Sequence, residues 1–372
     1  MIIGIDLLWV RPQINGGGES YIRNLLDGFK QYSPDNTEYC LFVSIDNQYT
    51  FEKYFNSKIF TKILCNINSN KPYKRIIWEN LKLNRLALKH NIDLMFVPVY
   101  SKPIYKTNRV KYIITIHDLQ ALHYPEYFTK LKYIWLKFAW KRCAKTSDKI
   151  IAISSFVKDD LTKNLKIDSN KIEVIYNSIV KSNKSIDFTI IKDKYNVIEN
   201  NYFYTVSSMT PHKNLKTIIN VIKRIKEENI KLPNKLVISG VGGNGKEELL
   251  QLIKEFNIEE NVIMTEFVSD EERDCLYKNA SAFLFPSIFE GFGMPPIEAM
   301  MLGTPVVACS IEVIREVSES KATYVEKYFD VDEWIEKIQL AYSTNRVEYI
   351  FEKYSLEKVT KEYEKTFRNI TS

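Results

Sequence analysis

Cysteine is scarce in this sequence, and the few cysteines follow no pattern of a metal or disulfide site. Five occur, far apart, and none forms a C-x-x-C pair or a Cys/His cluster with the spacing of metal ligands. An odd, scattered set predicts buried free thiols in a reducing compartment. The five are Cys40, Cys65, Cys143, Cys275 and Cys309.

Long apolar runs are absent too. No stretch reaches the roughly 18 uncharged apolar residues that suggest a spanning helix. The first residues lack a basic segment, and Asp6 lies within the first apolar run, so we expect no signal peptide. These absences predict a cytoplasmic protein without a spanning helix, and they allow a peripheral position on the inner face of the membrane.

Charge is unevenly distributed along the 372 residues. Residues 1–180 hold 27 Lys and Arg against 16 Asp and Glu, a net of +11, so residues 181–372 hold 25 against 30, a net of −5. The basic first half predicts contact with something anionic, such as a membrane surface, a phosphorylated lipid carrier, a polyanion or nucleic acid.

Strand-like apolar runs alternate with segments of helical period, which is typical of doubly wound α/β sheets. The alternation stops at a polar linker, Asn177–Asp187, and then restarts. We predict Rossmann-like domains over 1–180 and 190–354, with a last helix, 355–372, packing back on the first. The expected strands are Ile2–Leu8, Tyr39–Ile45, Leu94–Pro98, Tyr112–Ile116, Ile150–Ile153, Glu173–Tyr176, Phe203–Ser207, Lys235–Ser239, Val262–Phe267, Ala282–Pro286 and Pro305–Cys309; the expected first-half helices are Glu19–Tyr32, Trp78–Lys89, Lys130–Lys145 and Phe156–Leu165.

Residues 285–303, FPSIFEGFGMPPIEAMMLG, carry the most chemical information. A buried strand ends, a loop with Gly291 and Gly293 follows, and a helix begins near Pro295 and stops at Gly303. The loop glycines let backbone amides approach a ligand closely. The helix N-terminus favours phosphate.

Glu290 and Glu298 flank this amide-rich site, and a carboxylate accepts two hydrogen bonds from a sugar diol. The stretch resembles the Glu, seven residues, Glu signature of the retaining family-4 (group 1) glycosyltransferases of GT-B fold. That resemblance implies that Glu290 contacts the transferred sugar and Glu298 the nucleotide ribose. The alternative is that Glu290 is an ordinary loop carboxylate and that Glu298 is a charge at the start of the helix that complements the helix dipole. The donor-binding residues implied here are Glu290, Gly291, Phe292, Gly293, Met294 and Glu298.

Weaker signals extend the resemblance over nearly the whole chain. Gly16-Gly17-Gly18, after the first strand, resembles the family's glycine loop that faces the donor phosphates, although it could be an ordinary turn. His117, at a strand end, resembles the family histidine near the sugar; the alternative is a histidine at the edge of the core. Asp118 is expected to orient it.

Lys213 follows the first strand of the second domain and is placed to neutralise a diphosphate, as the family's phosphate lysine does. Many members carry an arginine a few residues earlier, where this chain has Ser207 or Ser208, so His212 is expected to help Lys213. Phe267 and Val268 resemble the place where backbone groups read the base.

Asp330-Val-Asp332 is a DxD sequence, which chelates a metal in another glycosyltransferase fold. Here it directly precedes a helical segment, so we interpret it as a helix N-cap with an acidic first turn. We expect no metal and no cofactor other than the nucleotide-sugar donor substrate.

The resemblance implies an α/β protein whose two doubly wound domains face a central cleft. The first domain would bind the acceptor and the second the donor. The predicted activity is retaining, metal-independent transfer of a hexose-type sugar to a glycan or lipid-linked acceptor in bacterial surface polysaccharide assembly, with no nucleic-acid partner. Charge stabilisation and positioning are assigned to Lys213, Gly17, Glu290, His117 and the Gly291–Met294 amides.

Other readings remain open. A nucleotide-sugar epimerase of the same fold would act on donor alone, and a non-catalytic GT-B scaffold would need none of these polar residues. A periplasmic-type binding protein is disfavoured by the missing signal peptide.

The segment Tyr127–Lys145 is dense in aromatic and basic residues. At about 100° per residue it has two apolar faces. We predict that the first face packs on the core. The second face, flanked by Lys130, Lys137 and Lys141, would meet an anionic membrane surface or be covered by a neighbouring segment. The first face is Leu131, Ile134, Trp135 and Phe138, and the second is Tyr133, Leu136 and Trp140.

Overall fold

The computed structural model describes residues 1–12, 14–104, 107, 109–182, 184–240, 242–243 and 245–371. The chain forms two compact units, one of Met1–Ser178 with Glu352–Ser372 and one of Ile179–Phe351. Asn183 of the expected linker and Ser372 of the expected last helix lie outside the described residues.

The described strands of unit 1 form one parallel sheet in the order β3-β2-β1-β4-β5-β6-β7. Their bounds are β1 Ile2–Asp6, β2 Glu38–Ser44, β3 Phe60–Cys65, β4 Leu94–Val97, β5 Lys111–Ile116, β6 Lys149–Ala152 and β7 Ile172–Val174. The helices are α1 Gly17–Tyr32, α2 Glu52–Phe55, α3 Pro72–Trp78, α4 Asn84–Lys89, α5 Gln120–His123, α6 Lys130–Thr146, α7 Ser155–Leu165 and α15 Leu356–Thr371.

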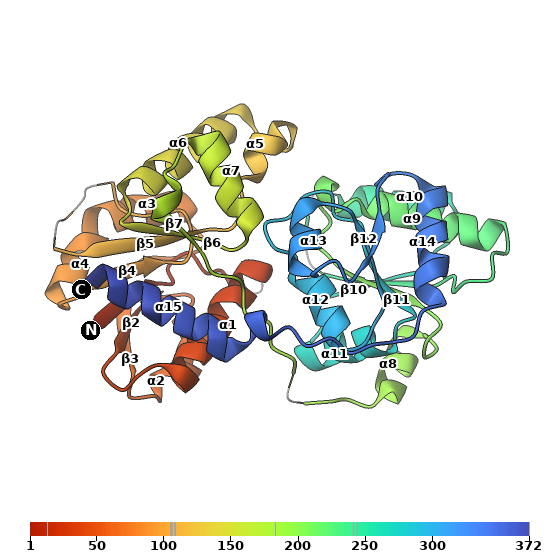
Figure 1. The fold of residues 1–372 in the computed structure, drawn as a ribbon, viewed down its shortest axis with the longest axis horizontal. Coiled ribbons are helices and arrows are strands. Elements are labelled where there is room, and N and C mark those ends of the chain that lie inside the picture. Colours follow the sequence, from red (N-terminus) through yellow and green to blue (C-terminus); the bar gives the residue numbers. More distant parts are fainter. Residues whose placement is uncertain are drawn as a thin grey trace. The chain divides into compact units, whose positions relative to one another are not determined.

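Helices lie on both faces of this sheet, with α1 and α15 on one side and α3, α6 and α7 on the other (Figure 1). A sheet buried on both faces needs strands that are apolar throughout, and every residue of β4 is buried. The last helix completes the same core, because Val359, Tyr363 and Phe367 are buried in it beside Phe29 of α1 and Phe96 of β4.

The described strands of unit 2 form a second parallel sheet in the order β10-β9-β8-β11-β12-β13. Their bounds are β8 Phe203–Val206, β9 Leu236–Ser239, β10 Val262–Glu266, β11 Ala282–Phe285, β12 Val306–Cys309 and β13 Thr323–Val325. The helices are α8 Phe188–Tyr195, α9 Leu215–Glu227, α10 Lys246–Glu255, α11 Asp270–Asn279, α12 Met294–Met301, α13 Glu312–Val317 and α14 Val331–Tyr342. The expectation of two parallel, Rossmann-like sheets is therefore confirmed.

Three local features differ from the sequence expectations. The strands β3 and β13 were not expected, and each is an edge strand of its sheet. The helix expected over Trp78–Lys89 begins earlier, at Pro72, and contains a π-helical turn at Glu79–Leu83. The first helix begins at Gly17 rather than Glu19, because Glu19 and Ser20 donate backbone hydrogen bonds to the carbonyl of Gly16.

The α6 helix buries the opposite face from the one expected. Leu136 and Trp140 are buried, Tyr133 is half-buried, and the face expected in the core is exposed. The membrane surface predicted on Tyr133, Leu136 and Trp140 is therefore wrong, because Leu136 and Trp140 pack inside unit 1.

The five cysteines are free and buried, as the sequence predicts. No helix among the described residues combines the length and the apolar character that crossing a bilayer requires.

Candidate active site

Strand order creates a topological switch point in each sheet. In unit 2 the chain runs from β8 outward to β10 and returns to β11 on the other side of β8. In unit 1 the corresponding point lies between β1 and β4. Ligands of open α/β sheets bind at such points, beyond the carboxyl ends of the strands.

Lys213 follows β8 and Glu290 follows β11, so both lie at the switch point of unit 2. The Lys213 Nζ lies 2.5 Å from Glu290 Oε1, and the two side chains are only 17% and 14% exposed. A backbone hydrogen bond of 2.9 Å from Ile288 to the carbonyl of His212 joins their loops. Because an ammonium group has three donors, Lys213 can hold Glu290 and still contact a phosphate.

The imidazole of His212 does not supply the positive charge expected of it. Burial, with the neighbouring charge of Lys213, lowers the pKa of His212 to about 4. The ring is therefore neutral at neutral pH, so His212 adds no positive charge to that of Lys213.

The loop after Glu290 leads into α12 as the sequence predicts, with Pro295 in the first turn and Gly303 just beyond the helix. Gly293 has φ +92°, a backbone conformation that other residues rarely adopt, so this position favours glycine. The amides of the first turn of α12 lack intrahelical partners, which makes this helix start favourable for an anion.

Glu298 lies on α12 and is nearly buried, with its side chain 15% exposed. Burial raises its pKa, while Arg273 and the hydroxyl of Tyr277 oppose that rise. Burial also disfavours the charge on Arg273, but the carboxylate of Glu298 and other neighbours raise the pKa of this guanidinium above its ordinary value. Glu298 is thus held as part of a buried network.

The remaining unit 2 candidates are less closely grouped. Ser207 directly follows β8, and its hydroxyl donates to the carbonyl of Ser208 at 2.8 Å, so it does not replace the missing arginine charge. Phe267 and Val268 follow β10, the edge strand that β9 separates from β8. The side chain of Phe267 is exposed.

A glycine-rich loop after β9 lies at the same edge of the sheet, although its sequence matches no motif considered above. A Cβ on Gly240 would lie 2.0 Å from the carbonyl oxygen of Ser207, and one on Gly243 would lie 2.4 Å from that of Met209. The loop therefore packs on the segment that leads to Lys213. Four glycines within residues 240–245 were the available signal.

In unit 1, His117 follows β5 and its Nε2 lies 2.8 Å from the carbonyl oxygen of Pro98. A carbonyl can only accept, so Nε2 carries the proton and Nδ1 is an acceptor. Burial lowers the pKa of His117, so the ring is neutral at neutral pH. The ring of Tyr21 stands edge-on to it at 4.8 Å between centroids.

Asp118, next to His117 in the chain, takes a local role. Asp118 Oδ1 accepts a hydrogen bond of 2.9 Å from the amide of Gln120, at the start of α5. Gly17 and Gly18 form the first residues of α1, after the switch-point strand β1. His117, Gly17 and Gly18 belong to unit 1, and the other candidates belong to unit 2.

The DxD sequence is a helix cap, as predicted. Asp330 Oδ1 accepts hydrogen bonds from the amides of Asp332 and Glu333, and Asp332 pairs with Arg224 at 2.9 Å. Within the described part of the chain, no group of three or more His, Cys, Asp or Glu residues is arranged to hold a metal.

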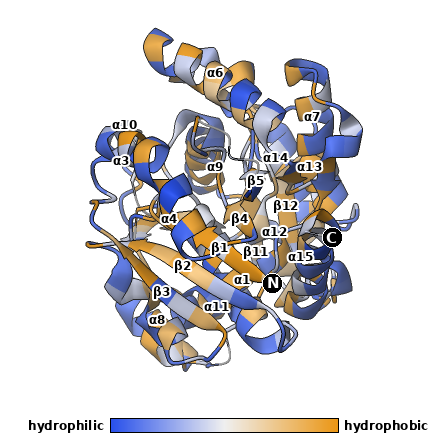
Figure 2. Ribbon diagram, turned by 90° about the vertical axis from the view of Figure 1, so that its left-hand side faces the viewer, coloured by the Kyte–Doolittle hydropathy of each residue, from blue (hydrophilic) through white to orange (hydrophobic). Residues whose placement is uncertain are grey.

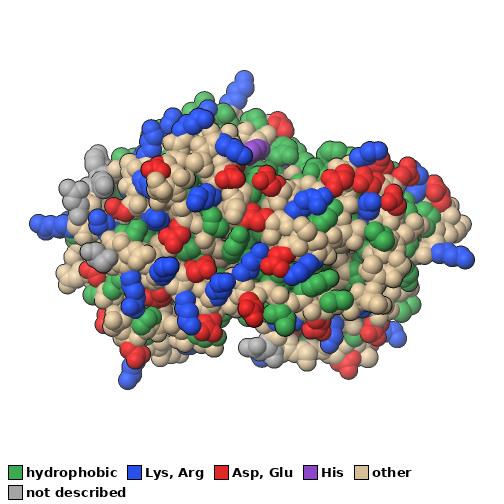
Figure 3. Space-filling model, in the orientation of Figure 1, with side chains coloured by type: hydrophobic (Ala, Val, Ile, Leu, Met, Phe, Trp, Pro, Cys, Tyr) green, Lys and Arg blue, Asp and Glu red, His purple; other side chains and the backbone are tan. Residues whose placement is uncertain are grey.

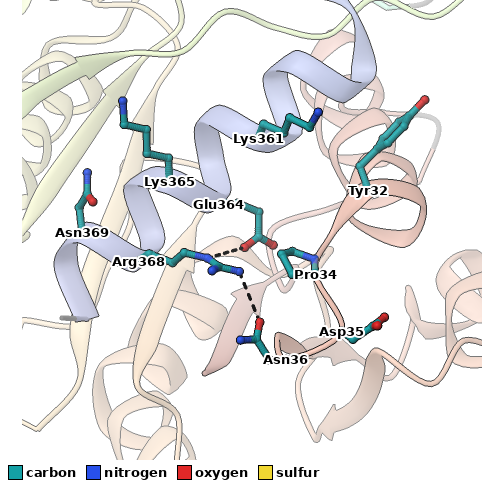
Figure 4. Close-up of a pocket in the computed structure, with 9 residues that line it drawn as sticks. All are labelled: Tyr32, Pro34, Asp35, Asn36, Lys361, Glu364, Lys365, Arg368 and Asn369. Carbon is teal, nitrogen blue, oxygen red and sulfur yellow. Dashed lines mark hydrogen bonds and ion pairs between the residues drawn. The ribbon is translucent and has the colours of Figure 1, made fainter.

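A pocket of about 590 Å³ lies in unit 1 between α15 and the turn after α1 (Figure 4). Arg368 reaches across it to Asn36 at 3.4 Å, and its Nε lies 3.8 Å from Glu364. None of the sequence-predicted site residues lines this pocket.

Family comparisons agree with the motifs. Residues 187–358 match the family described as "Glycosyl transferases group 1", and residues 15–182 match "Glycosyltransferase Family 4". The chain belongs to these glycosyltransferases.

Individual glycosyltransferases are similar to this chain over different lengths. The O-antigen chain mannosyltransferase RfbU of Salmonella typhimurium is 35% identical over 212 residues, 57% of this chain and 56% of that protein. The chain thus spans about half the length of the first curated relatives it matches. The N-acetylgalactosamine-N,N'-diacetylbacillosaminyl-diphospho-undecaprenol 4-alpha-N-acetylgalactosaminyltransferase of Campylobacter jejuni is 29% identical over 265 residues, 67% of this chain and 66% of that protein.

Among solved glycosyltransferase structures, Anabaena Alr3699/HepE in complex with UDP-glucose matches with a TM-score of 0.71 at 16% identity, over 99% of this chain and 100% of that chain. At this identity the likeness shows the fold alone, the two Rossmann-like domains of the GT-B class.

Proposed function

We propose that this chain moves a hexose-type sugar from a nucleotide-diphosphate sugar to a glycan or lipid-linked acceptor, with retention of the anomeric configuration and without a metal ion. The observation that carries the proposal is the 2.5 Å contact between Lys213 and Glu290 at the unit 2 switch point. It sets a cation suited to a diphosphate beside a carboxylate suited to a sugar, where sheets of this class bind ligands.

In this proposal unit 2 binds the donor. Lys213 and the start of α12 neutralise the diphosphate, and Glu298 accepts hydrogen bonds from the ribose. Glu290 contacts the transferred sugar. Ser207 lies beside the phosphates, and Phe267 and Val268 lie on the side of the base.

Unit 1 binds the acceptor, and His117 accepts a hydrogen bond from a sugar hydroxyl through Nδ1. Gly17 and Gly18 of unit 1 also face the donor phosphates in this proposal. The bond from the anomeric carbon to the diphosphate oxygen breaks, the acceptor oxygen takes its place on the same face, and the departing phosphate oxygen takes the acceptor's proton.

The relatives suggest which substrates to test first. The similarity to an O-antigen chain mannosyltransferase favours mannose and surface polysaccharide assembly. The similarity to an enzyme whose acceptor is a diphospho-undecaprenol favours a sugar carried on a polyprenyl diphosphate.

The test is a donor panel of GDP-mannose and UDP-, ADP- and dTDP-sugars, each with and without a polyprenyl-diphosphate glycan, analysed by mass spectrometry. Lys213→Ala should lose product, whereas Lys216→Ala, a matched lysine paired with Glu248 on the surface, should retain it. Conversion of a donor to its epimer without acceptor would favour an epimerase instead. No turnover and no nucleotide binding with any donor would favour a scaffold.

A further inference from the structure

The α6 helix carries a row of large apolar side chains in solvent. Leu131, Ile134, Trp135 and Phe138 are 83%, 62%, 43% and 54% exposed. Their spacing of three and four residues places them on one face, because a helix turns by about 100° per residue. This exposed α6 face lies opposite the side that Leu136, Ala139, Trp140, Cys143 and Ala144 bury in unit 1.

The charge of α6 is entirely basic. Its 17 residues contain five lysines and one arginine and no acidic residue. Lys130, Lys137 and Lys141 are exposed along one flank of the apolar row, and Lys132 is exposed on the other. Lys and Arg side chains gather over this region in Figure 3, and Figure 2 shows apolar and polar residues alternating along the helix.

The aromatic residues beside α6 add to the same surface. Trp135 and Phe138 lie with ring centroids 6.4 Å apart, and Lys132 lies over the ring of Phe128 at 5.0 Å. A helix with an aromatic and aliphatic row bordered by lysines binds at a bilayer interface, where the apolar side chains enter the acyl boundary and the lysines meet anionic headgroups.

We propose that the exposed α6 face docks unit 1 on the surface of an anionic phospholipid bilayer. The occupant is identified by charge complementarity, since an apolar row on a helix with basic and no acidic residues matches an acidic headgroup layer. None of the residues of the exposed α6 face belongs to the proposed donor site, most of whose residues lie in unit 2.

The experiment is co-sedimentation of the full chain with vesicles of phosphatidylcholine, with and without phosphatidylglycerol, in the absence of donor and acceptor. Binding should require phosphatidylglycerol and weaken in high salt. The fluorescence of Trp135 should shift to the blue on binding. Trp9, Trp140 and Trp334 are buried and Trp78 is half-buried, so Trp135→Phe should remove most of that shift.

Two sets of variants separate the apolar and basic contributions. The triple variant Leu131→Gln, Ile134→Gln and Phe138→Gln should abolish binding. A matched triple in unit 2, Ile198→Gln, Phe329→Gln and Ile350→Gln, changes equally exposed apolar residues and should not. Replacing Lys130, Lys137 and Lys141 by Glu should weaken binding on the order of 100-fold, and Arg at the same positions should retain it.

Three outcomes would overturn the proposal: no binding of the wild type, binding unchanged by the α6 triple, or a dimer that only the α6 triple dissociates. The last would assign this face to a second copy of the chain. Because no sugar donor is present, failure here leaves the proposed transfer activity untouched.

Discussion

Tyr277 of α11 donates a hydrogen bond of 2.9 Å to Oε2 of Glu298 on α12, and Nε of Arg273 lies 3.7 Å from the same oxygen. Both contacts come from one face of α11, because residues 273 and 277 are one helical turn apart. They hold the carboxylate of Glu298 through Oε2.

The first prediction concerns this network. Glu298→Ala should weaken nucleotide binding by about 1.5–3 kcal/mol, the usual value of a hydrogen bond to a charged group. Tyr277→Phe should weaken it less, because it releases the carboxylate without removing it. Titration calorimetry with nucleoside diphosphates measures both. Equal affinity in Glu298→Ala and in the surface control Glu248→Ala would contradict the assignment.

The second prediction concerns Glu290, whose partner Lys213 also faces the proposed diphosphate. Glu290→Ala should lower turnover by about 1.5–3 kcal/mol of transition-state stabilisation while leaving nucleotide affinity nearly intact. Steady-state kinetics with saturating donor separates the two effects. A wild-type rate in this variant would remove Glu290 from the reaction.

The third prediction is that transfer continues in excess EDTA. Asp330 is occupied as the cap of α14 and Asp332 pairs with Arg224, so the DxD carboxylates have structural roles. Lys213 supplies the positive charge in the proposal. Activity that vanishes and returns with Mn²⁺ or Mg²⁺ would contradict this prediction.

The fourth prediction is a pH effect on stability from Glu79. Its Oε1 lies 3.2 Å from Nε of Arg75 and its Oε2 accepts from Ser101, in a buried place beside Asp6. Burial, with the charge of Asp6, raises the pKa of Glu79 from 4.5 to about 8. The folded state therefore holds this proton more tightly than the unfolded state, so its contribution to stability falls as pH rises from about 4.5 to about 8.

Glu79→Gln should flatten that decline. The melting temperature of the variant should therefore increase relative to that of the wild type as pH rises. Glu52→Gln, on the surface, serves as the control. If the melting temperatures of the wild type and Glu79→Gln change in parallel across this pH range, Glu79 does not titrate there.

The fifth prediction concerns the return of the chain to unit 1. Phe367 is fully buried and contacts the rings of Phe29 and Phe96, so Phe367→Ala should cost about 3–5 kcal/mol. Lys361→Ala, on the exposed side of α15, should change stability by about 0.5 kcal/mol or less. Urea denaturation measures both, and equal midpoints would mean that α15 adds little to the core.

The sequence determined the two sheets and most of their strands, because a parallel strand buried on both faces must be apolar along its length. It failed at β3 and β13, two edge strands with partial burial, although it found the edge strands β7 and β10. Lys62 interrupts the apolar pattern of β3, and β13 has only three residues. The sequence also marked Glu290, Glu298 and Lys213, since each stands in a distinctive local motif.

Only the tertiary structure decided how those residues are partnered. Arg273 and Tyr277 reach Glu298 from another helix, and no local pattern links them. The same holds for α6, whose sequence offers two apolar faces. Helical periodicity defines both faces, but the position of the sheet decides which one is buried, and it buries Trp140 while leaving Leu131 and Phe138 in solvent.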